Sequence, residues 1–188
     1  KAYLVEGDYR TLKISKNKFK ETKKIKYHPI YDNPPDGDIS VDAVTGTAML
    51  IDRDKLKLIN DWDTNIFNYF EDMDLCLRFR IKGFEIIKIR NAEVDHDAFS
   101  SHDENFSKQM DFSRNWHYSW SRFYFLKKHT TILNAYKFGI SLFLKSIIKS
   151  LFYIFFKKSK SITHFAKAYG ILFAILNLES KYRPQVKI

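Results

Sequence analysis

One long apolar segment near the end of the chain limits the folds that this sequence can adopt. Residues 131–156 (TILNAYKFGISLFLKSIIKSLFYIFF) are numerous enough to span a bilayer as one helix. Lys137, Lys145 and Lys149 nevertheless lie inside this segment. A charged side chain at the centre of a membrane-spanning helix costs about 2.5–3.5 kcal/mol on insertion scales. Three such charges argue against a simple membrane span.

A polar residue recurs at every fourth position along this segment: Lys137, Ser141, Lys145 and Lys149. This spacing places them on one stripe of a helix, and Ser146 and Ser150 are predicted to lie beside it. Such a helix lies in the plane of a membrane interface with its lysines toward anionic lipid. We therefore expect the three lysines to contact an anionic membrane surface. The alternative is a soluble helical layer packed on the rest of the protein.

Positive charge is concentrated in the same part of the chain. Residues 127–188 hold twelve Lys or Arg and one acid, Glu179, which gives +11. Residues 27–126 hold 11 basic and 18 acidic groups, which gives −7. This asymmetry indicates different partners for different segments. A nucleic-acid partner is not expected, because the basic residues lie on an apolar helix and no recognised RNA- or DNA-binding pattern is present.

The single cysteine, Cys76, excludes a disulfide framework or a cysteine-based zinc site within one chain. The sequence begins at Lys1 and opens without a signal-peptide pattern. We therefore expect a piece of a longer protein in a reducing, cytoplasmic setting.

Three segments in the first half alternate in type. Residues 41–51 (VDAVTGTAMLI) are predicted to form a buried strand, with Gly46 where the backbone approaches a neighbour closely. Residues 71–82 are predicted to form a helix that Gly83 ends. Residues 84–89 are predicted to form a second strand. The order strand, helix, strand favours an α/β arrangement, and the chain after residue 105 is expected to be helical.

The stretch 67–78 (FNYFEDMDLCLR) carries the most chemical information. It places Glu71, Asp72 and Asp74 in the first turn of the predicted helix, directly after an aromatic loop. A helix start is open at one end and fixed at the other, so it suits a positioned general base. The alternative is that these acids only cap the helix and complement its dipole.

Several elements occur in a characteristic order between residues 41 and 101: Trp62-Asp63, Tyr69-Phe70-Glu71-Asp72-x-Asp74, Gly83-Phe84 and His96. This order resembles glycosyltransferase family 2, in particular bacterial rhamnosyl- and galactofuranosyltransferases of surface-polysaccharide synthesis. Residues 114–129 and Tyr182-Arg183-Pro184 resemble the family more loosely. The resemblance implies an α/β fold. Residues 1–108 would be the acceptor-side, C-terminal half of a GT-A catalytic domain, and residues 109–188 an all-helical, basic and amphipathic membrane-surface tail.

The same resemblance implies an inverting transferase that moves a sugar from a nucleotide-sugar donor to a glycan or lipid-linked acceptor during cell-envelope polysaccharide synthesis. Asp72 would be the general base, with Glu71 beside it. His96 would help to hold a divalent metal, Mg²⁺ or Mn²⁺, on the donor diphosphate. The residues implied to bind the acceptor are Trp62, Asp63, Tyr69, Asp74 and Gly46. A peripheral position on the cytoplasmic face of the inner membrane would suit a lipid-linked acceptor.

Alternatives remain open at this stage. His96 can instead be a structural histidine, and Asp97 and His102 are nearby alternative ligands. The family's nucleotide-binding half, which ends in Asp-x-Asp, is not recognisable: that spacing occurs five times, never after a strand–helix–strand run. This chain alone is therefore not expected to bind a sugar nucleotide properly. The alternative to a transferase is therefore a non-catalytic membrane-surface binding protein or an inactive remnant that lacks the donor-binding half.

Overall fold

A computed structural model describes residues 12–15, 18–21, 37–89, 91–95 and 106–184 of the 188-residue chain. The chain divides into two compact units. The first comprises Lys1–Asp63 and Glu71–His96, and the second comprises Thr64–Phe70 and Asp97–Ile188. The segment Thr64–Phe70 thus belongs with the C-terminal helices, whereas the helix that follows it belongs to the first unit. The expected domain boundary after residue 108 stays a prediction.

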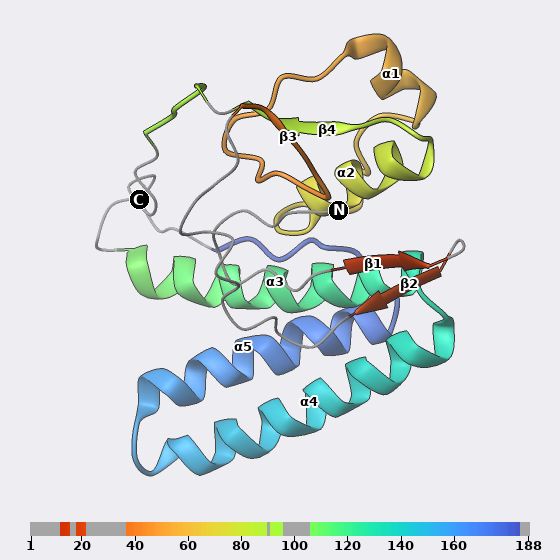
Figure 1. The fold of residues 1–188 in the computed structure, drawn as a ribbon. Helices are drawn as coiled ribbons and strands as arrows, with labels where there is room; N and C mark the ends of the chain where they lie inside the picture. Colours follow the sequence, from red (N-terminus) through yellow and green to blue (C-terminus); the bar gives the residue numbers. More distant parts are fainter. Residues whose placement is uncertain (1–11, 16–17, 22–36, 90, 96–105, 185–188) are drawn as a thin grey trace. The chain divides into compact units, whose positions relative to one another are not determined.

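The first unit contains short strands and two helices (Figure 1): β1 (Leu12–Ser15), β2 (Lys18–Glu21), β3 (Ile39–Val41), α1 (Arg53–Leu58), α2 (Glu71–Ile81) and β4 (Ile86–Lys88). Strands β1 and β2 form an antiparallel pair. Strands β3 and β4 form a second antiparallel pair, in which Val41 lies opposite Ile86. Each described sheet has two strands.

The predicted α/β class, as half of a GT-A domain, is wrong for the residues that the structure describes. Their strands are three or four residues long, and the long helices dominate the fold. The segment 41–51 leaves the extended conformation after Val41 and turns at Gly46. Among the described residues its β-branched side chains have no further strand to pair with, and β-propensity depends on such pairing. The strand predicted over 84–89 is confirmed in a shorter form as β4.

The predicted helix over 71–82 is confirmed as α2, because its local signals agree with one another. Three acids occupy the first turn, where the positive end of the helix dipole favours them. Gly83 ends the helix with φ +85°, and the Phe84 N–H donates back to the Phe79 carbonyl at 3.0 Å. One face of α2 packs into the core of the first unit, which is built on Ile59, Leu75 and Phe79.

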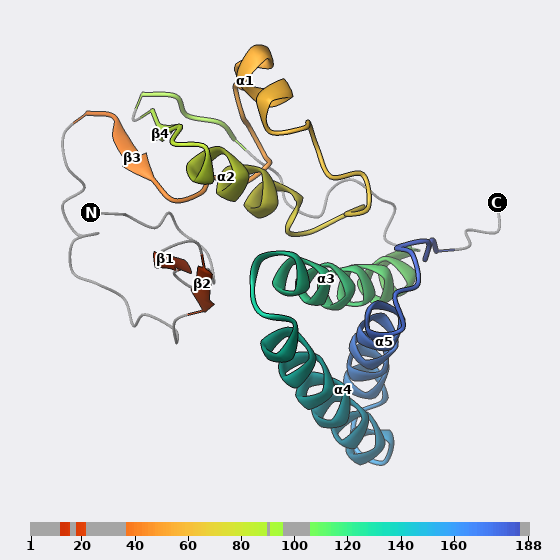
Figure 2. The same cartoon turned by 90° about the vertical axis from the view of Figure 1, so that its right-hand side faces the viewer.

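The second unit is a bundle of three helices: α3 (Ser107–His129), α4 (Ile132–Ile154) and α5 (Lys158–Ile175). Helix α5 packs against both α3 and α4 (Figures 1 and 2). Aromatic residues of α3 dominate the core, and small or β-branched residues of the other two helices fill the space between them: Trp116, Trp120, Phe123, Leu126, Ala135, Ile171 and Ala174. The expectation that the chain is helical after residue 105 is confirmed as far as the end of α5 at Ile175, and the described residues after α5 are not helical.

Helices α3 and α5 approach each other so closely that one position has no room for a side chain. A Cβ atom placed on Gly170 would lie 2.2 Å from the carbonyl oxygen of Trp116. That oxygen is part of the α3 backbone, so it cannot rotate away as the end of a side chain can. A Cβ atom placed on Gly139 of α4 would likewise lie 2.7 Å from the buried ring of Phe123. Glycine at these two positions lets the helices meet.

The buried side of α4 is lined by small residues: Ala135, Gly139, Ser146 and Ser150. Ser150 and Ser161 of α5 exchange hydrogen bonds, because the hydroxyl of each donates to the carbonyl of the other at 3.0 and 2.8 Å. The prediction that Ser146 and Ser150 lie beside the exposed lysines is therefore wrong. Both side chains are small enough to fit the helix interface. The hydroxyl of Ser150 also forms hydrogen bonds there with Ser161. No helix among the described residues combines the length and the apolar content that crossing a membrane requires.

After α5 the chain turns at Asn177, which has φ +57°, and continues along α3. His117 of α3, which is fully buried, fixes this C-terminal segment. Its Nε2 lies 2.8 Å from the Tyr182 carbonyl and therefore carries the proton, and its Nδ1 accepts from the Ser180 hydroxyl at 3.0 Å. Trp120 adds a bond from Nε1 to the Leu178 carbonyl at 2.9 Å. Burial lowers the pKa of His117 below its usual range.

The close helix approach predicts a large cost for one added methyl group. Gly170→Ala gains about 1 kcal/mol of helix propensity but forces α5 away from α3, and we expect a net loss of about 2 kcal/mol in the free energy of unfolding. Urea unfolding followed by tryptophan fluorescence measures this loss. Gly46→Ala is the matched control, with an expected change within about 0.5 kcal/mol, because its Cβ meets ordinary contacts at 3.7 Å. Equal stability of Gly170→Ala and the parent would contradict the packing described.

The buried His117 predicts that stability depends on pH in a defined direction. The unfolded chain binds a proton on this histidine near pH 6.5, whereas the folded chain resists it because the folded pKa is lowered. Stability is therefore complete above pH 6.5 and is lost as the pH falls below it, by at most about 1.4 kcal/mol per pH unit. His117→Asn should lower stability at pH 8 and flatten this slope. Chemical unfolding at several pH values measures both, and an unchanged slope would contradict a neutral, buried His117.

Candidate functional site

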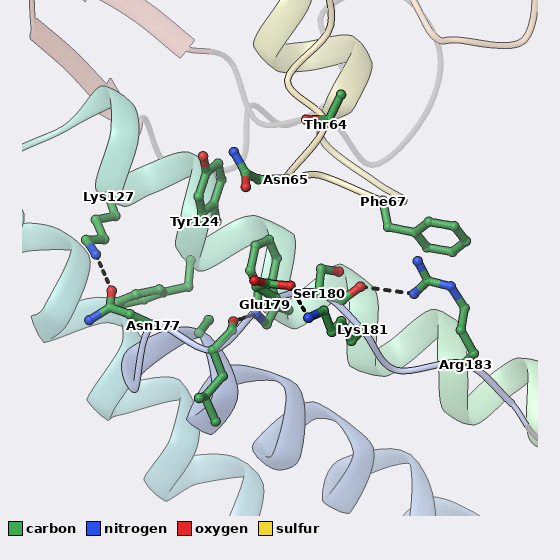
Figure 3. A pocket seen from close by; sticks show the side chains of 14 residues that line it. Thr64, Asn65, Phe67, Tyr124, Lys127, Asn177, Glu179, Ser180, Lys181 and Arg183 are labelled. Carbon is green, nitrogen blue, oxygen red and sulfur yellow. Dashed lines mark hydrogen bonds and ion pairs between the residues drawn. The ribbon is translucent and has the colours of Figure 1, made fainter.

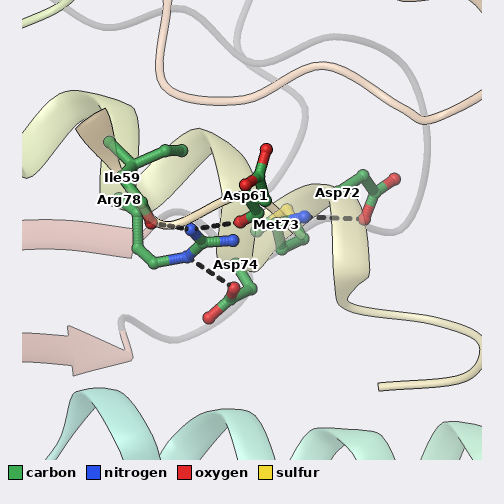
Figure 4. A network of polar contacts seen from close by, with 6 residues as sticks. All are labelled: Ile59, Asp61, Asp72, Met73, Asp74 and Arg78. Atoms are coloured by element: carbon green, nitrogen blue, oxygen red, sulfur yellow. Dashed lines mark hydrogen bonds and ion pairs between the residues drawn. The ribbon is translucent and has the colours of Figure 1, made fainter. Parts of the chain in front are cut away.

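Two backbone N–H groups hold the carboxylate of Asp72 at the start of α2. Oδ2 accepts from the Gly46 N–H at 3.0 Å. Oδ1 accepts from the Met73 N–H at 2.7 Å, as Figure 4 shows. The bond from Gly46 joins residues 26 positions apart, so it is a tertiary contact and not only a helix cap. The side chain is half-buried. Asp72 thus has the fixed orientation and partial access to solvent that a general base requires.

Glu71, the adjacent carboxylate, has a different environment. It is half-buried, and its Oε2 is enclosed without a hydrogen-bond partner among the described residues. Burial raises the pKa of Glu71, and the neighbouring charge of Asp72 raises it further. The two neighbouring acids are therefore chemically unequal. Asp72 is oriented by donors, whereas Glu71 has an environment that favours its protonated form.

Gly46 acts on the site through its backbone N–H, and the site does not require position 46 to lack a side chain. It is exposed and lies in a turn, and an added Cβ would be 3.7 Å from the Cβ of Asp72. This is an ordinary contact, so the prediction that close backbone approach requires glycine here is wrong. The hydrogen bond places Gly46 beside Asp72, and its role in acceptor binding stays a prediction.

Asp74 is fully buried and holds α2 to the preceding loop. Its Oδ2 accepts from Nε of Arg78 at 2.8 Å (Figure 4). Nη1 of the same arginine donates to the carbonyls of Ile59 and Asp61, at 2.5 and 2.6 Å. A buried charge is tolerated when it is paired in this way. The geometry gives Asp74 a structural contact, and its role in acceptor binding stays a prediction.

The remaining acceptor residues are divided between the two units. Trp62 and Asp63 belong to the first unit with Asp72; the Trp62 ring is 37% exposed and Asp63 is half-buried. Tyr69 belongs to the second unit, where its ring packs edge-on against Tyr118 at 5.7 Å.

The aromatic loop before α2 has an unusual backbone. Tyr69 and Phe70 both have positive φ, at +65° and +69°. Such a conformation costs of order 1–3 kcal/mol for each residue that is not glycine. The ring of Phe70 packs against Tyr118 and Phe125, at centroid distances of 5.5 and 5.4 Å, and these contacts help to maintain it. Strain of this kind is concentrated at functional sites, and here it immediately precedes the two carboxylates.

The residues predicted to hold a metal ion do not belong to the described part of the chain, so the metal site stays a prediction. His96 and the alternatives Asp97 and His102 lie outside the described residues. Within the described ranges, no three His, Cys, Asp or Glu side chains are grouped so that they could hold a metal ion. The described residues therefore do not provide a fitting ligand set for Mg²⁺ or Mn²⁺.

The second unit contains a cavity of about 320 Å³ between the C-terminal segment, the end of α3 and the loop at residues 64–67 (Figure 3). Its walls combine amide, charged and aromatic side chains, among them Asn65, Phe67, Tyr124, Lys127, Asn177, Glu179 and Arg183. The Arg183 guanidinium lies 3.3 Å from the centre of the Phe67 ring, and Lys127 donates to the Asn177 side chain. A cavity with such walls suits a small polar ligand with an apolar face, such as a sugar.

Sequence reasoning did not predict this cavity. Its lining comes from three separate segments, and only the fold brings them together. The one available signal was Arg183, within the Tyr182-Arg183-Pro184 stretch that resembles the end of family 2 transferases.

The three lysines predicted to contact a membrane, Lys137, Lys145 and Lys149, are all exposed on α4. Their position agrees with an outward stripe, and contact with lipid stays a prediction.

Comparison of the chain with protein-family models, with curated proteins and with solved structures found no match in any of the three.

Proposed function

We propose that this protein transfers a sugar, with inversion at the anomeric carbon, from a nucleotide-sugar to a hydroxyl group of a glycan or lipid-linked acceptor. The proposal rests on the orientation of the Asp72 carboxylate at the start of α2. The backbone N–H of Gly46, which is distant in the sequence, donates a hydrogen bond to it. The sequence order around it, from Trp62 to Gly83-Phe84, resembles glycosyltransferase family 2. The proposal concerns the activity of the complete protein.

Asp72 acts as the general base. One carboxylate oxygen accepts the proton of the acceptor hydroxyl as that oxygen attacks the anomeric carbon of the donor. The bond from the anomeric carbon to the diphosphate oxygen breaks, and its electron pair leaves with the nucleoside diphosphate. One displacement inverts the anomeric configuration and needs no covalent sugar–enzyme intermediate.

Among the three acids of the first helical turn, the environments favour Asp72 for this task. Asp74 is fully buried and paired with Arg78. Oε2 of Glu71 has no hydrogen-bond donor among the described residues, whereas two backbone N–H groups orient the Asp72 carboxylate. In the same first unit, the partly exposed Trp62 ring offers a flat apolar surface of the kind that packs against a sugar.

A second candidate is a non-catalytic membrane-surface binding protein. The observation in its favour is the row of large apolar side chains exposed along α4. A membrane-surface binding protein does not require the hydrogen bond between Gly46 and Asp72. The effect of changing Asp72 on turnover therefore distinguishes the two functions.

The proposal predicts a selective loss of rate. The substitution Asp72→Asn keeps the shape and most acceptor capacity of the side chain but removes the base. Turnover should fall on the order of 10²–10⁴-fold. The measurement is nucleoside diphosphate release by the complete protein from UDP-, GDP- and dTDP-linked hexoses and deoxyhexoses, with Mg²⁺ and a membrane extract that supplies the acceptor.

Asp54→Asn is the matched control, because Asp54 is an exposed acid in the first turn of α1 and also lies at a helix start. Its rate should equal that of the parent. Near-normal turnover of Asp72→Asn would contradict the assignment of the base. Failure of every donor to release a diphosphate would contradict the proposed function and favour the non-catalytic candidate.

A further inference from the structure

Helix α4 presents its large apolar side chains to the outside of the second unit. The exposed residues follow one side of the helix and continue into the turn after it: Leu133, Ile140, Leu144, Ile148, Leu151, Phe152, Ile154, Phe155 and Phe156. We call this set the α4 outer face. The two phenylalanines of the turn are the most exposed, at 84% for Phe155 and 74% for Phe156. An apolar surface of this kind on a folded protein indicates a partner.

The fully buried residues of α4 are all small, namely Ala135, Gly139, Ser146 and Ser150, and the larger Tyr136, Phe138, Leu142 and Phe143 pack against the core while only partly buried. A helix that folds in water normally buries its large apolar residues and exposes small or polar ones. Helices in contact with lipid show the reverse arrangement: small residues and hydroxyl hydrogen bonds join the helices, and large apolar residues face outward. The bonds between Ser150 and Ser161 fit this second pattern.

The charged residues in the sequence of α4 and α5 all have one sign. Residues 131–176 contain seven lysines and neither aspartate nor glutamate: Lys137, Lys145, Lys149, Lys157, Lys158, Lys160 and Lys167. On α4, Lys137, Lys145 and Lys149 are spaced by eight and four residues, so they follow one side of the helix. Three more lie at and just after the turn that carries Phe155 and Phe156. This combination of exposed aromatic rings with flanking lysines is typical of helices that lie at a membrane interface.

A cluster of cationic groups lies close to the α4–α5 turn. His164 stacks on Tyr153 at a centroid distance of 5.6 Å, and Nζ of Lys160 lies 5.2 Å from the centre of the same ring. Burial lowers the pKa of His164, and the charges of Lys167, Lys149 and Lys160 lower it further, so all three lysines act on one small region. Nδ1 of His164 has no hydrogen-bond partner among the described residues. Such a region attracts phosphate groups.

We propose that the α4 outer face inserts into the boundary between headgroups and acyl chains of an anionic bilayer. Phe155 and Phe156 enter first, and the lysines of α4 and of the turn lie over the lipid phosphates. The helix lies in the plane of the interface and does not cross the membrane.

Charge favours lipid over a second copy of the chain as the occupant. In a symmetric dimer the same surface meets itself, so the lysines along one outer face would meet those along the other with no acid between them. Anionic lipid headgroups neutralise these charges, and each lysine near such a surface tightens binding about fivefold, equivalent to about 1 kcal/mol. The proposal is independent of the proposed glycosyl transfer, because it rests on other residues and its test does not measure activity.

The test is sedimentation of the complete protein with vesicles of phosphatidylcholine alone or with 30% phosphatidylserine. We expect binding to the anionic vesicles that is at least about tenfold tighter than to the neutral ones, and release in 0.5 M NaCl. The double variant Lys149→Glu, Lys160→Glu should lose at least about tenfold in binding. The double variant Phe155→Ser, Phe156→Ser should lose a similar factor, because it removes the apolar contact and leaves the charge.

Matched controls come from exposed positions outside the helical unit. Leu50→Ser changes an apolar side chain that is 99% exposed, and Lys82→Glu with Lys88→Glu reverses two exposed lysines. These variants should bind as the parent does. Because all changed side chains are exposed, circular dichroism should show the parent's helix content throughout.

Three outcomes would overturn the proposal. The first is absence of binding to either vesicle. The second is equal binding to both, without an effect of salt. The third is a dimer in size-exclusion chromatography with light scattering that the Phe155→Ser, Phe156→Ser variant converts to a monomer, because the face would then join two copies of the chain.

Discussion

The close approach of the α3 and α5 backbones at Gly170 determines the construction of the second unit. There the distance from a hypothetical Cβ to the Trp116 carbonyl oxygen is 2.2 Å, which excludes every residue except glycine without a shift of one helix. With the helices this close, α5 packs directly on the aromatic core of Trp116, Trp120 and Phe123. The same approach brings the end of α5 to a position from which the chain continues along α3. His117 and Trp120 then hold that segment by hydrogen bonds.

Helix α4 occupies a different position, because α5 already covers much of the aromatic core. Its fully buried residues are the small Ala135, Gly139, Ser146 and Ser150, and Tyr136, Phe138, Leu142 and Phe143 pack against the core while only partly buried. Its other large apolar side chains, those of the α4 outer face, lie in water, which is an unfavourable environment for them. Lipid would relieve this cost, and the lysines around the outer face would select an anionic surface. On this account the packing of the bundle and its position at a membrane have one physical origin.

The sequence predicted those parts of the fold in which several local signals agree. Helix α2 has acids in its first turn and Gly83 at its end, and both act within a few residues. The segment 41–51 was predicted wrongly, because apolar β-branched residues indicate a strand only where a neighbouring strand is available. The burial of Ser146 and Ser150 was missed for a similar reason. A polar residue that recurs with the lysines indicates the exposed side of a helix unless its hydroxyl finds a partner, as Ser150 does in Ser161.

The candidate site shows the same division between local and tertiary information. The motif around Glu71 and Asp72 was visible in the sequence, whereas the burial of Asp74 and its bond to Arg78 depend on the folded loop at residues 59–61. The cavity lined by Asn65, Lys127 and Asn177 brings together segments that are far apart in the chain. Its existence follows from the course of the C-terminal segment along α3, for which no local pattern in the sequence gives a signal.

The most direct test of the account is the environment of residue 155 on a membrane. Cys76 is buried and its pKa is raised to about 11, so a cysteine in Phe155→Cys should react selectively with an environment-sensitive fluorophore. The account predicts that anionic vesicles shift the emission of this label to shorter wavelength and that brominated acyl chains quench it. The same label in Leu50→Cys should keep its emission. An unshifted and unquenched label at residue 155, with the vesicles in excess, would contradict the account.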